Sequence, residues 1–348
     1  MAKVKIGVVG YGTIGERCAD GVAQQDDMEL VGVVDVAASL PLRALVESKR
    51  GYPVYCGIKE NVSKLEKAGI KVAGMVEDLL GQVEMVIDAT SPGVGTQNRK
   101  LYEKAGVKAT FQAGEKHKAG DTVFHPCHNY DKVKGMSYIE MLSCNTTAIA
   151  RLAGLVEKNF GLTRMLCLIV RRGGDISETH KGPIDAAIVE KTPSHQCDDF
   201  KVVSPHLTVV TSVVTVPVCH GHVQTVEFET KEEATKEALV KLIDAYPRAR
   251  MFRIADGFVS NSHVFDYMRD AGKPRGDMYE VPVWDETIYI EGKKILLTHM
   301  VPQEAIVIPE NIDAIRCALA LEDDAESAMA HTDRCLGLEQ GAHVEKGG

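Results

Sequence analysis

The first 140 residues alternate short β-branched runs with helical patterns of apolar residues. Residues 4–9 predict a strand, residues 15–25 a helix, and residues 30–34 a second strand. Further strands are predicted at residues 71–73, 83–89 and 108–112, with an amphipathic helix over 95–105. This alternation predicts an α/β fold with a Rossmann-like, doubly wound parallel sheet.

The pattern changes from about Gly161, where longer β-rich runs surround a single helix. The runs cover residues 165–171, 201–218, 224–229 and 287–300, and the helix lies near 232–245. Such a mixture predicts an α+β domain with a mainly antiparallel sheet. We therefore expect a first domain of residues 1–142, completed by a C-terminal helix over 311–348, and a catalytic domain of residues 143–310.

Composition and charge exclude several classes of protein. The 348 residues carry a net charge of −9 and no long basic block, which disfavours a nucleic-acid partner. No long apolar run or signal-peptide pattern is present, so we expect a cytoplasmic protein without a membrane partner.

The cysteines do not form a recognisable framework. There are nine, an odd number, and none has C-x-x-C spacing, so neither a disulfide scaffold nor a metal site is expected. One alternative stays open, in which Cys219, His220 and His222 bind zinc together with His125 or Cys127. The segment His125–His128 is otherwise expected to be a surface loop.

A glycine-rich turn follows the first predicted strand. Gly10, Gly12 and Gly15 bracket Thr13 and Ile14 in a G-x-G-x-x-G pattern that opens a helix, as dinucleotide-binding turns do. Asp35 ends the next strand, where a carboxylate binds an adenosine ribose and repels a 2′-phosphate. The pattern predicts NAD rather than NADP. The alternative is a structural turn, with Asp35 capping the following segment.

Cys144 lies within Ser143-Cys144-Asn145-Thr146-Thr147, between a strand over 136–142 and a helix that extends to about residue 160. Free N–H groups at a helix start lower the pKa of a thiol and stabilise an oxyanion. Such a thiolate would need a base, and His220 and His222 are candidates. Alternatively, Cys144 is an inert thiol and Ser143 only caps the helix.

Several ordered stretches resemble the phosphorylating glyceraldehyde-3-phosphate dehydrogenases of the archaeal type, over nearly the whole chain. They are residues 10–15, 23–28, 51–53, 66–70, 111–116, 143–147, 170–172, 181–184, 193–195 and 309–314.

The resemblance implies roles for individual residues. Cys144 becomes the nucleophile and His222 the base, which takes the thiol proton and later helps to stabilise the hemithioacetal oxygen. Hydride passes to NAD, and phosphate cleaves the resulting thioester to an acyl phosphate. The implied substrate residues are Ser143, Asn145, Thr146, His195 and Gln196, and the implied cofactor residues include Thr13, Ile14, Gly114, Arg172 and Gln303. A phosphorylated aldehyde, inorganic phosphate and a homotetramer are also implied.

The chain departs from the family in ways that bear on the substrate. Asp35 stands where many relatives carry a residue suited to NADP, which favours NAD. Gln196 replaces a second histidine, and Cys197-Asp198 replaces a Gly-Pro pair in a phosphate-contacting loop. Two alternatives therefore remain: a semialdehyde dehydrogenase that uses NAD or NADP, and a non-catalytic NAD-binding protein.

Overall fold

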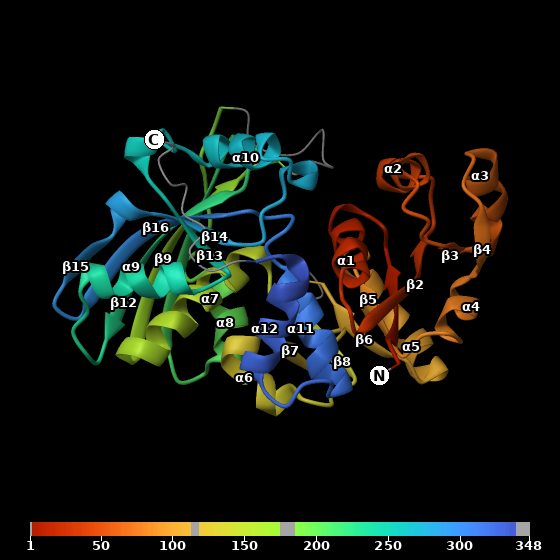
Figure 1. Ribbon diagram of the computed structural model, residues 1–348, viewed down its shortest axis with the longest axis horizontal. Coiled ribbons are helices and arrows are strands. Elements are labelled where there is room, and N and C mark those ends of the chain that lie inside the picture. Colours follow the sequence, from red (N-terminus) through yellow and green to blue (C-terminus); the bar gives the residue numbers. More distant parts are fainter. Residues whose placement is uncertain (1, 113–117, 175–184, 339–348) are drawn as a thin grey trace. The chain divides into compact units, whose positions relative to one another are not determined.

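The computed structural model describes residues 2–112, 118–174 and 185–338, and contacts group the chain into two compact units (Figure 1). Unit 1 contains Met1–Leu142 and Ile308–Leu336, and unit 2 contains Ser143–Val307. None of the described helices is long and apolar enough to cross a membrane.

Unit 1 is built on an eight-stranded sheet in which every neighbouring pair is parallel. Its strands are β1 (Val4–Val9), β2 (Met28–Asp35), β3 (Val54–Cys56), β4 (Val72–Met75), β5 (Met85–Asp88), β6 (Lys108–Phe111), β7 (Thr122–Phe124) and β8 (Tyr138–Met141). They are ordered β4-β3-β2-β1-β5-β6-β8-β7. The order runs outward from β1 in one direction and from β5 in the other, so the predicted doubly wound parallel sheet is confirmed. In such sheets ligands bind at the carboxyl ends of the strands beside this point of reversal.

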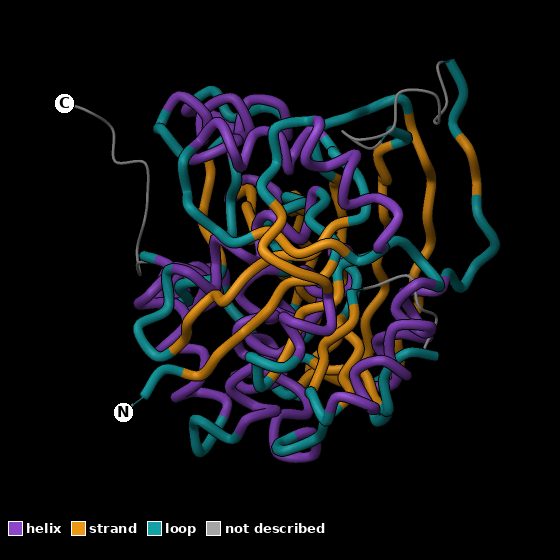
Figure 2. Tube along the Cα trace, turned by 90° about the vertical axis from the view of Figure 1, so that its right-hand side faces the viewer, coloured by secondary structure: helices purple, strands orange, loops and turns teal. Residues whose placement is uncertain are grey.

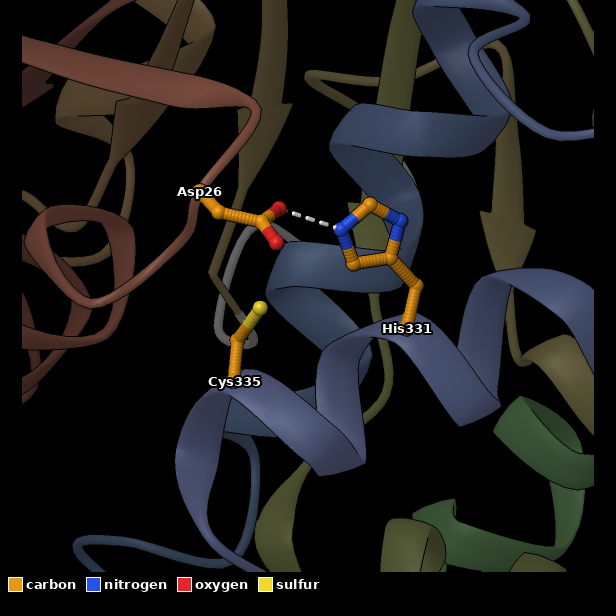
Figure 3. Close-up of side chains that lie close together, drawn as sticks. All are labelled: Asp26, His331 and Cys335. Carbon is orange, nitrogen blue, oxygen red and sulfur yellow. Dashed lines mark hydrogen bonds and ion pairs between the residues drawn. The ribbon is translucent and has the colours of Figure 1, made fainter.

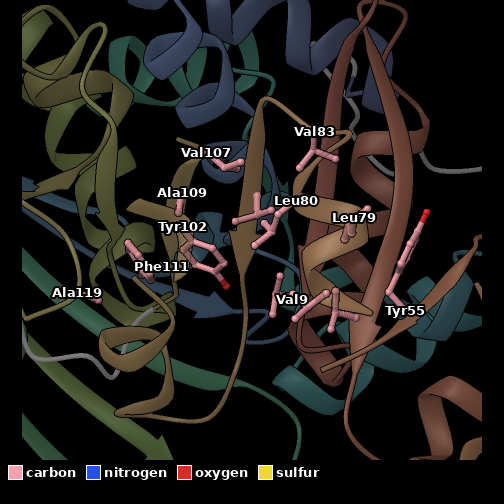
Figure 4. Close-up of a cluster of buried hydrophobic side chains, with 13 residues drawn as sticks. Val9, Tyr55, Leu79, Leu80, Val83, Tyr102, Val107, Ala109, Phe111 and Ala119 are labelled. Atoms are coloured by element: carbon pink, nitrogen blue, oxygen red, sulfur yellow. The ribbon is translucent and has the colours of Figure 1, made fainter. Parts of the chain in front are cut away.

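The helices of unit 1 bury an aliphatic core against this sheet. They are α1 (Thr13–Ala23), α2 (Leu40–Ser48), α3 (Val62–Lys67), α4 (Val76–Leu80), α5 (Val94–Ala105), α6 (Pro126–Val133), α11 (Ile308–Leu319) and α12 (Ala325–Leu336). Figure 4 shows one cluster, in which Leu79 and Tyr102 from helices meet Val9 and Phe111 from strands. Gly21 allows α11 to approach α1 closely, since a Cβ there would lie 2.8 Å from Ile308.

Unit 2 contains a second, mixed sheet. Figure 2 shows the strands of both sheets in orange. Its strands are β9 (Leu162–Arg172), β10 (Ile188–Val189), β11 (Thr208–Val216), β12 (His222–Thr230), β13 (Ala249–Phe252), β14 (Val281–Trp284), β15 (Tyr289–Glu291) and β16 (Lys294–Val301). They follow the order β10-β11-β9-β12-β16-β14-β13, with β15 also paired to β16. The pairs β11–β9 and β13–β14 are parallel and the others antiparallel, which confirms a mainly antiparallel sheet.

The helices of unit 2 are α7 (Cys144–Phe160), α8 (His195–Val203), α9 (Lys236–Ala245) and α10 (Asn261–Asp270). A buried arginine, Arg151, fixes α7 in the core. Its guanidinium donates to the backbone carbonyls of Tyr279 at 2.5 Å and Ile306 at 2.6 Å. Hydrogen bonds from a buried cation are stronger than neutral ones, so they hold the helix that carries Cys144 in a defined place.

Some expectations for the elements are wrong. The run over residues 201–218 is not one strand: α8 continues to Val203 and β11 begins at Thr208, because Phe200 and Val203 are buried at helical spacing. Residues 287–300 include the hairpin of β15 and β16, whose turn uses Gly292 at φ +57°. The C-terminal helical segment consists of two helices, α11 and α12.

The segment His125–His128 is not a surface loop. His125 is fully buried and caps α6, where its Nδ1 accepts the N–H of Cys127 at 3.3 Å. Pro126 occupies the first turn, where a missing N–H carries no penalty. A histidine is not among the usual capping residues, so the pattern gave no helix signal.

Candidate active site

A pocket of about 390 Å³ opens in unit 1 at the carboxyl ends of the central strands. Its lining includes Gly10 and Gly12 after β1, Asp35 at the end of β2, and Thr90 after β5. The pocket therefore lies at the point where the strand order reverses, as the fold predicts for a ligand site.

The glycines of the turn are required by its geometry. Gly10 has φ +88°, and a Cβ on it would lie 2.8 Å from the backbone of Ala89. A Cβ on Gly15 would lie 1.8 Å from the carbonyl oxygen of Gly10. A Cβ on Gly12, by contrast, meets no atom within 4 Å, so this position leaves space for a ligand beside the start of α1. Thr13 and Ile14 are the first two residues of that helix.

The carboxylate of Asp35 organises the turn after β2. Its Oδ1 accepts the backbone N–H groups of Val36 at 2.6 Å and Ala37 at 3.2 Å, and its Oδ2 accepts the hydroxyl of Ser39. Asp35 thus has the structural role that the sequence left open as an alternative. It also lines the pocket, so the two roles are compatible.

Cys144 is the first residue of α7, directly after the N-cap residue Ser143. The Ser143 hydroxyl accepts the N–H of Thr146 at 3.4 Å, so the sequence Ser-Cys begins the helix at the thiol. The Cys144 Sγ lies 3.7 Å from Nε2 of His222. The sulfur and the imidazole are therefore in contact, although 78 residues separate them in the chain.

His222 is the first residue of β12 and is almost completely buried. Its Nδ1 accepts the backbone N–H of Arg172, at the end of β9, at 3.0 Å. Because a backbone N–H only donates, a neutral ring here carries its proton on Nε2, the nitrogen that faces Cys144.

Arg172 connects this pair to a neighbouring carboxylate. Its buried guanidinium donates to Glu304 at 2.6 Å and to the carbonyl of Cys219 at 2.9 Å. Gln303, directly before Glu304, is half-buried in the connection that follows β16. Sequence reasoning missed Glu304, because a single acid outside any motif gives no signal.

The electrostatic surroundings keep both groups of the pair neutral. Burial raises the pKa of the Cys144 thiol to about 11, against the opposing effects of Arg172 and the Asn145 backbone N–H. Burial lowers the pKa of His222 to about 3, and the cations Arg172 and Arg171 lower it further. A thiol proton therefore does not move spontaneously to the imidazole in this structure.

The two residues after Cys144 are held within the protein. The Asn145 Oδ1 accepts a hydrogen bond from Gln224 at 2.7 Å, and Thr146 is fully buried with its hydroxyl 2.9 Å from that of Ser143. These contacts fix the first turn of α7 around the sulfur. Gln224, like Glu304, carried no sequence signal.

His195 and Gln196 begin α8. His195 is exposed, whereas Gln196 is buried and accepts the hydroxyl of Ser194 at 2.5 Å. The next residue, Cys197, is buried with its thiol 3.0 Å from the carbonyl of Val209. Of the three departures in this segment, Gln196 and Cys197 thus fill interior positions, and only Asp198 is exposed.

The alternative zinc site around Cys219 does not form among the described residues. His220 stacks on Phe265 with ring centroids 4.7 Å apart, and Cys219 is exposed. Among the described residues, one group of three potential metal ligands lies close together, at a different place: Asp26, His331 and Cys335. Gly114, expected at the cofactor site, lies outside the described residues.

Comparison with known proteins agrees with this arrangement. Residues 143–287 match the family described as glyceraldehyde 3-phosphate dehydrogenase, C-terminal domain, and residues 4–111 match dihydrodipicolinate reductase, N-terminus. The glyceraldehyde-3-phosphate dehydrogenase of Archaeoglobus fulgidus is 40% identical over 341 residues, 97% of this chain and 99% of the relative. That of Methanothermus fervidus is 37% identical over 337 residues, 96% and 99% of the two chains.

This chain belongs to the glyceraldehyde-3-phosphate dehydrogenase family. The resemblance seen in the sequence is therefore confirmed. Membership in a dehydrogenase family, together with the glycine turn and its pocket, supports a nicotinamide cofactor.

The pKa of Cys144 in this dehydrogenase predicts a steep pH dependence of alkylation. Only the thiolate reacts, and a pKa raised to about 11 leaves a small thiolate fraction at neutral pH. We expect the rate of iodoacetamide labelling at Cys144 to rise about tenfold per pH unit from pH 7 towards pH 10. Mass spectrometry of the labelled peptides measures this rate, with exposed Cys219 as the internal control. A rate that levels off below pH 8 would contradict the prediction.

Proposed function

We propose that this protein is a phosphorylating glyceraldehyde-3-phosphate dehydrogenase that oxidises its substrate through a thioester on Cys144. One observation carries the proposal: in a member of this family, the Cys144 Sγ lies 3.7 Å from His222 Nε2 at the start of a helix. A nucleophilic side chain within hydrogen-bonding reach of a second polar side chain is the arrangement expected for covalent catalysis.

In this proposal the Cys144 sulfur attacks the aldehyde carbon, and the carbonyl oxygen becomes the oxyanion of a thiohemiacetal. The N–H groups at the start of α7 and the helix dipole stabilise negative charge there. Loss of hydride from the carbon gives a thioester, and inorganic phosphate then displaces the thiolate to release an acyl phosphate. The nicotinamide, when bound, supplies the hydride acceptor.

His222 serves as a hydrogen-bond donor rather than as the base that the resemblance implied. With Nδ1 accepting the N–H of Arg172, the Nε2–H points at the sulfur. It stabilises the thiolate and then the oxyanion, while the thiol proton leaves to solvent. A second proton on His222 would break the bond from Arg172, in agreement with the lowered pKa.

For the cofactor we propose NAD, bound over the pocket of unit 1. The free space beside Gly12 and the start of α1 would hold its pyrophosphate, and Asp35 would accept the adenosine ribose hydroxyls. The negative charge of Asp35 would repel the 2′-phosphate of NADP.

We propose a homotetramer, as the family resemblance implies. Apolar side chains remain exposed on β9 and β10: Leu168 is 50% exposed and Val189 is 78% exposed. Apolar groups exposed together on one sheet are typical of subunit interfaces. Light scattering measures the assembly mass, and a monomer at micromolar concentration would contradict this proposal.

We also propose a cytoplasmic location. None of the nine cysteines is in a disulfide, although three are half-buried and one is exposed. Thiols in this number that do not form disulfides fit a reducing compartment. Fractionation of the native cell, followed by detection of the chain, tests the location; recovery in the extracytoplasmic fraction would contradict it.

The function predicts that the protein forms NADH from glyceraldehyde 3-phosphate and NAD only when phosphate or arsenate is present. Cys144→Ser should lose this activity by about 10³-fold or more, because a serine hydroxyl is far less acidic than a thiol. Cys219→Ser, at an exposed thiol outside the pair, is the matched control.

Two other outcomes of this assay would distinguish the alternatives. Activity with other aldehydes but none with glyceraldehyde 3-phosphate would identify a semialdehyde dehydrogenase. Unchanged function in Cys144→Ser would identify a non-catalytic protein.

The donor role of His222 predicts different effects for two substitutions. His222→Ala removes the donor and should lower kcat/KM about 10²- to 10³-fold. His222→Gln places an amide N–H near the position of Nε2 and should recover about tenfold of that loss. Glutamine cannot act as a base, so equal losses in both folded variants would support the base role instead.

The role of Asp35 predicts the choice of cofactor. Removing its charge in Asp35→Asn should raise kcat/KM for NADP about fivefold to tenfold relative to NAD, since a nearby charge contributes about 1 kcal/mol in water. Glu29→Gln, at an exposed site in the same strand, controls for net charge. A wild-type protein that prefers NADP would overturn the NAD proposal.

A further inference from the structure

Three metal-ligating side chains converge on unit 1, away from the carboxyl ends of its strands (Figure 3). His331 and Cys335 are four residues apart on α12 and therefore lie on one face of that helix. Asp26 comes from the connection between α1 and β2. The ligand atoms of the three residues all lie within 4.8 Å of one another.

We propose that Asp26, His331 and Cys335 bind a divalent ion of the zinc class. Imidazole and thiolate are the preferred ligands of zinc and its first-row neighbours, whereas magnesium and calcium prefer oxygen. Three protein ligands leave one tetrahedral position, which water fills from the surface, since the Asp26 side chain is 62% exposed.

The surroundings of His331 support this assignment. Its Nδ1 is 2.7 Å from a carboxylate oxygen of Glu322, and its Nε2 faces Asp26 at 2.6 Å. A carboxylate on the far nitrogen fixes the orientation of the ring, as is typical of metal-bound histidines. Glu322 thus orients the ligand, and Nε2 is the nitrogen presented to the ion.

Asp26 is oriented in the same way. Arg334 donates to its Oδ2 at 3.2 Å, which leaves Oδ1 directed at His331. His331 lies between two carboxylates, with Nδ1 towards Glu322 and Nε2 towards Asp26. An ion held by Asp26, His331 and Cys335 is bound by an unprotonated imidazole nitrogen and a thiolate, so binding is coupled to deprotonation of its ligands.

The charges around the site are nearly balanced by such an ion. Asp26, Glu322 and a Cys335 thiolate contribute three negative charges, and Arg334 contributes one positive charge. The nearby carboxylate of Asp27 is already paired with Arg316 at 2.7 Å. A divalent cation therefore neutralises the site without leaving an excess of positive charge.

Cobalt(II) is a direct probe, because a cobalt–thiolate bond gives a near-ultraviolet charge-transfer band. The measurement is made in Cys144→Ser protein, since Cys144 and His222 are themselves a thiol–imidazole pair. We expect one equivalent of cobalt per chain and a band that zinc displaces. Cys335→Ser should abolish the band, and Cys219→Ser should leave it unchanged. Glu322→Ala should weaken binding about 10- to 100-fold.

Thermal unfolding gives a second readout that separates loss of the site from loss of the fold. Zinc should raise the Tm of the Cys144→Ser protein, but not that of the same protein carrying Cys335→Ser or His331→Gln. Each variant is first melted without metal to establish that it folds. Absence of the band, or a band that survives Cys335→Ser, would overturn the proposal.

Discussion

The chemistry of unit 2 depends on one hydrogen bond, from the backbone N–H of Arg172 to Nδ1 of His222. Antiparallel pairing between β9 and β12 produces it, since Val170 lies opposite Val223 and the end of β9 therefore lies beside the start of β12. The register therefore fixes the plane of the imidazole and the nitrogen that bears its proton. A shift by one residue would turn His222 to the opposite face of the sheet, away from α7.

The same arrangement determines the charge of the site. Arg172 lies beside both members of the pair, lowering the pKa of the thiol and of the imidazole alike. Burial raises the pKa of the thiol, so the effect of Arg172 opposes it. Burial lowers the pKa of the imidazole, so the effect of Arg172 adds to it. His222 therefore remains neutral throughout the physiological range, and Arg172 offsets only part of the effect of burial on the thiol, whose pKa stays raised at about 11. Glu304 lies 2.6 Å from the buried guanidinium, so attraction between the two charges offsets part of the free energy needed to bury the cation.

Much of this could be predicted from the sequence, and the exceptions have physical causes. β1 was predicted at its observed bounds because an apolar run ends in a glycine turn. Cys144 was placed correctly at a helix start because its neighbour Ser143 is a typical capping residue. The distance between its sulfur and His222 Nε2 could not be predicted from local patterns, because strand register depends on long-range pairing. Glu304 and Gln224 were missed since each becomes meaningful only beside its partner in space. His125 was misjudged because its burial arises from tertiary packing around α6.

Two thiol–imidazole combinations in one chain show how surroundings, rather than residue type, decide chemistry. In His222, Nδ1 accepts a backbone N–H and cations lie nearby, so Nε2 presents a proton to Cys144. In His331, Nδ1 contacts the carboxylate of Glu322 and Nε2 contacts that of Asp26, so Nε2 is suited to hold a cation beside Cys335. The first environment would stabilise negative charge that develops on a substrate oxygen, and the second would stabilise a bound cation. The groups that contact the far nitrogen of each ring therefore distinguish the proposed catalytic site from the proposed ion site.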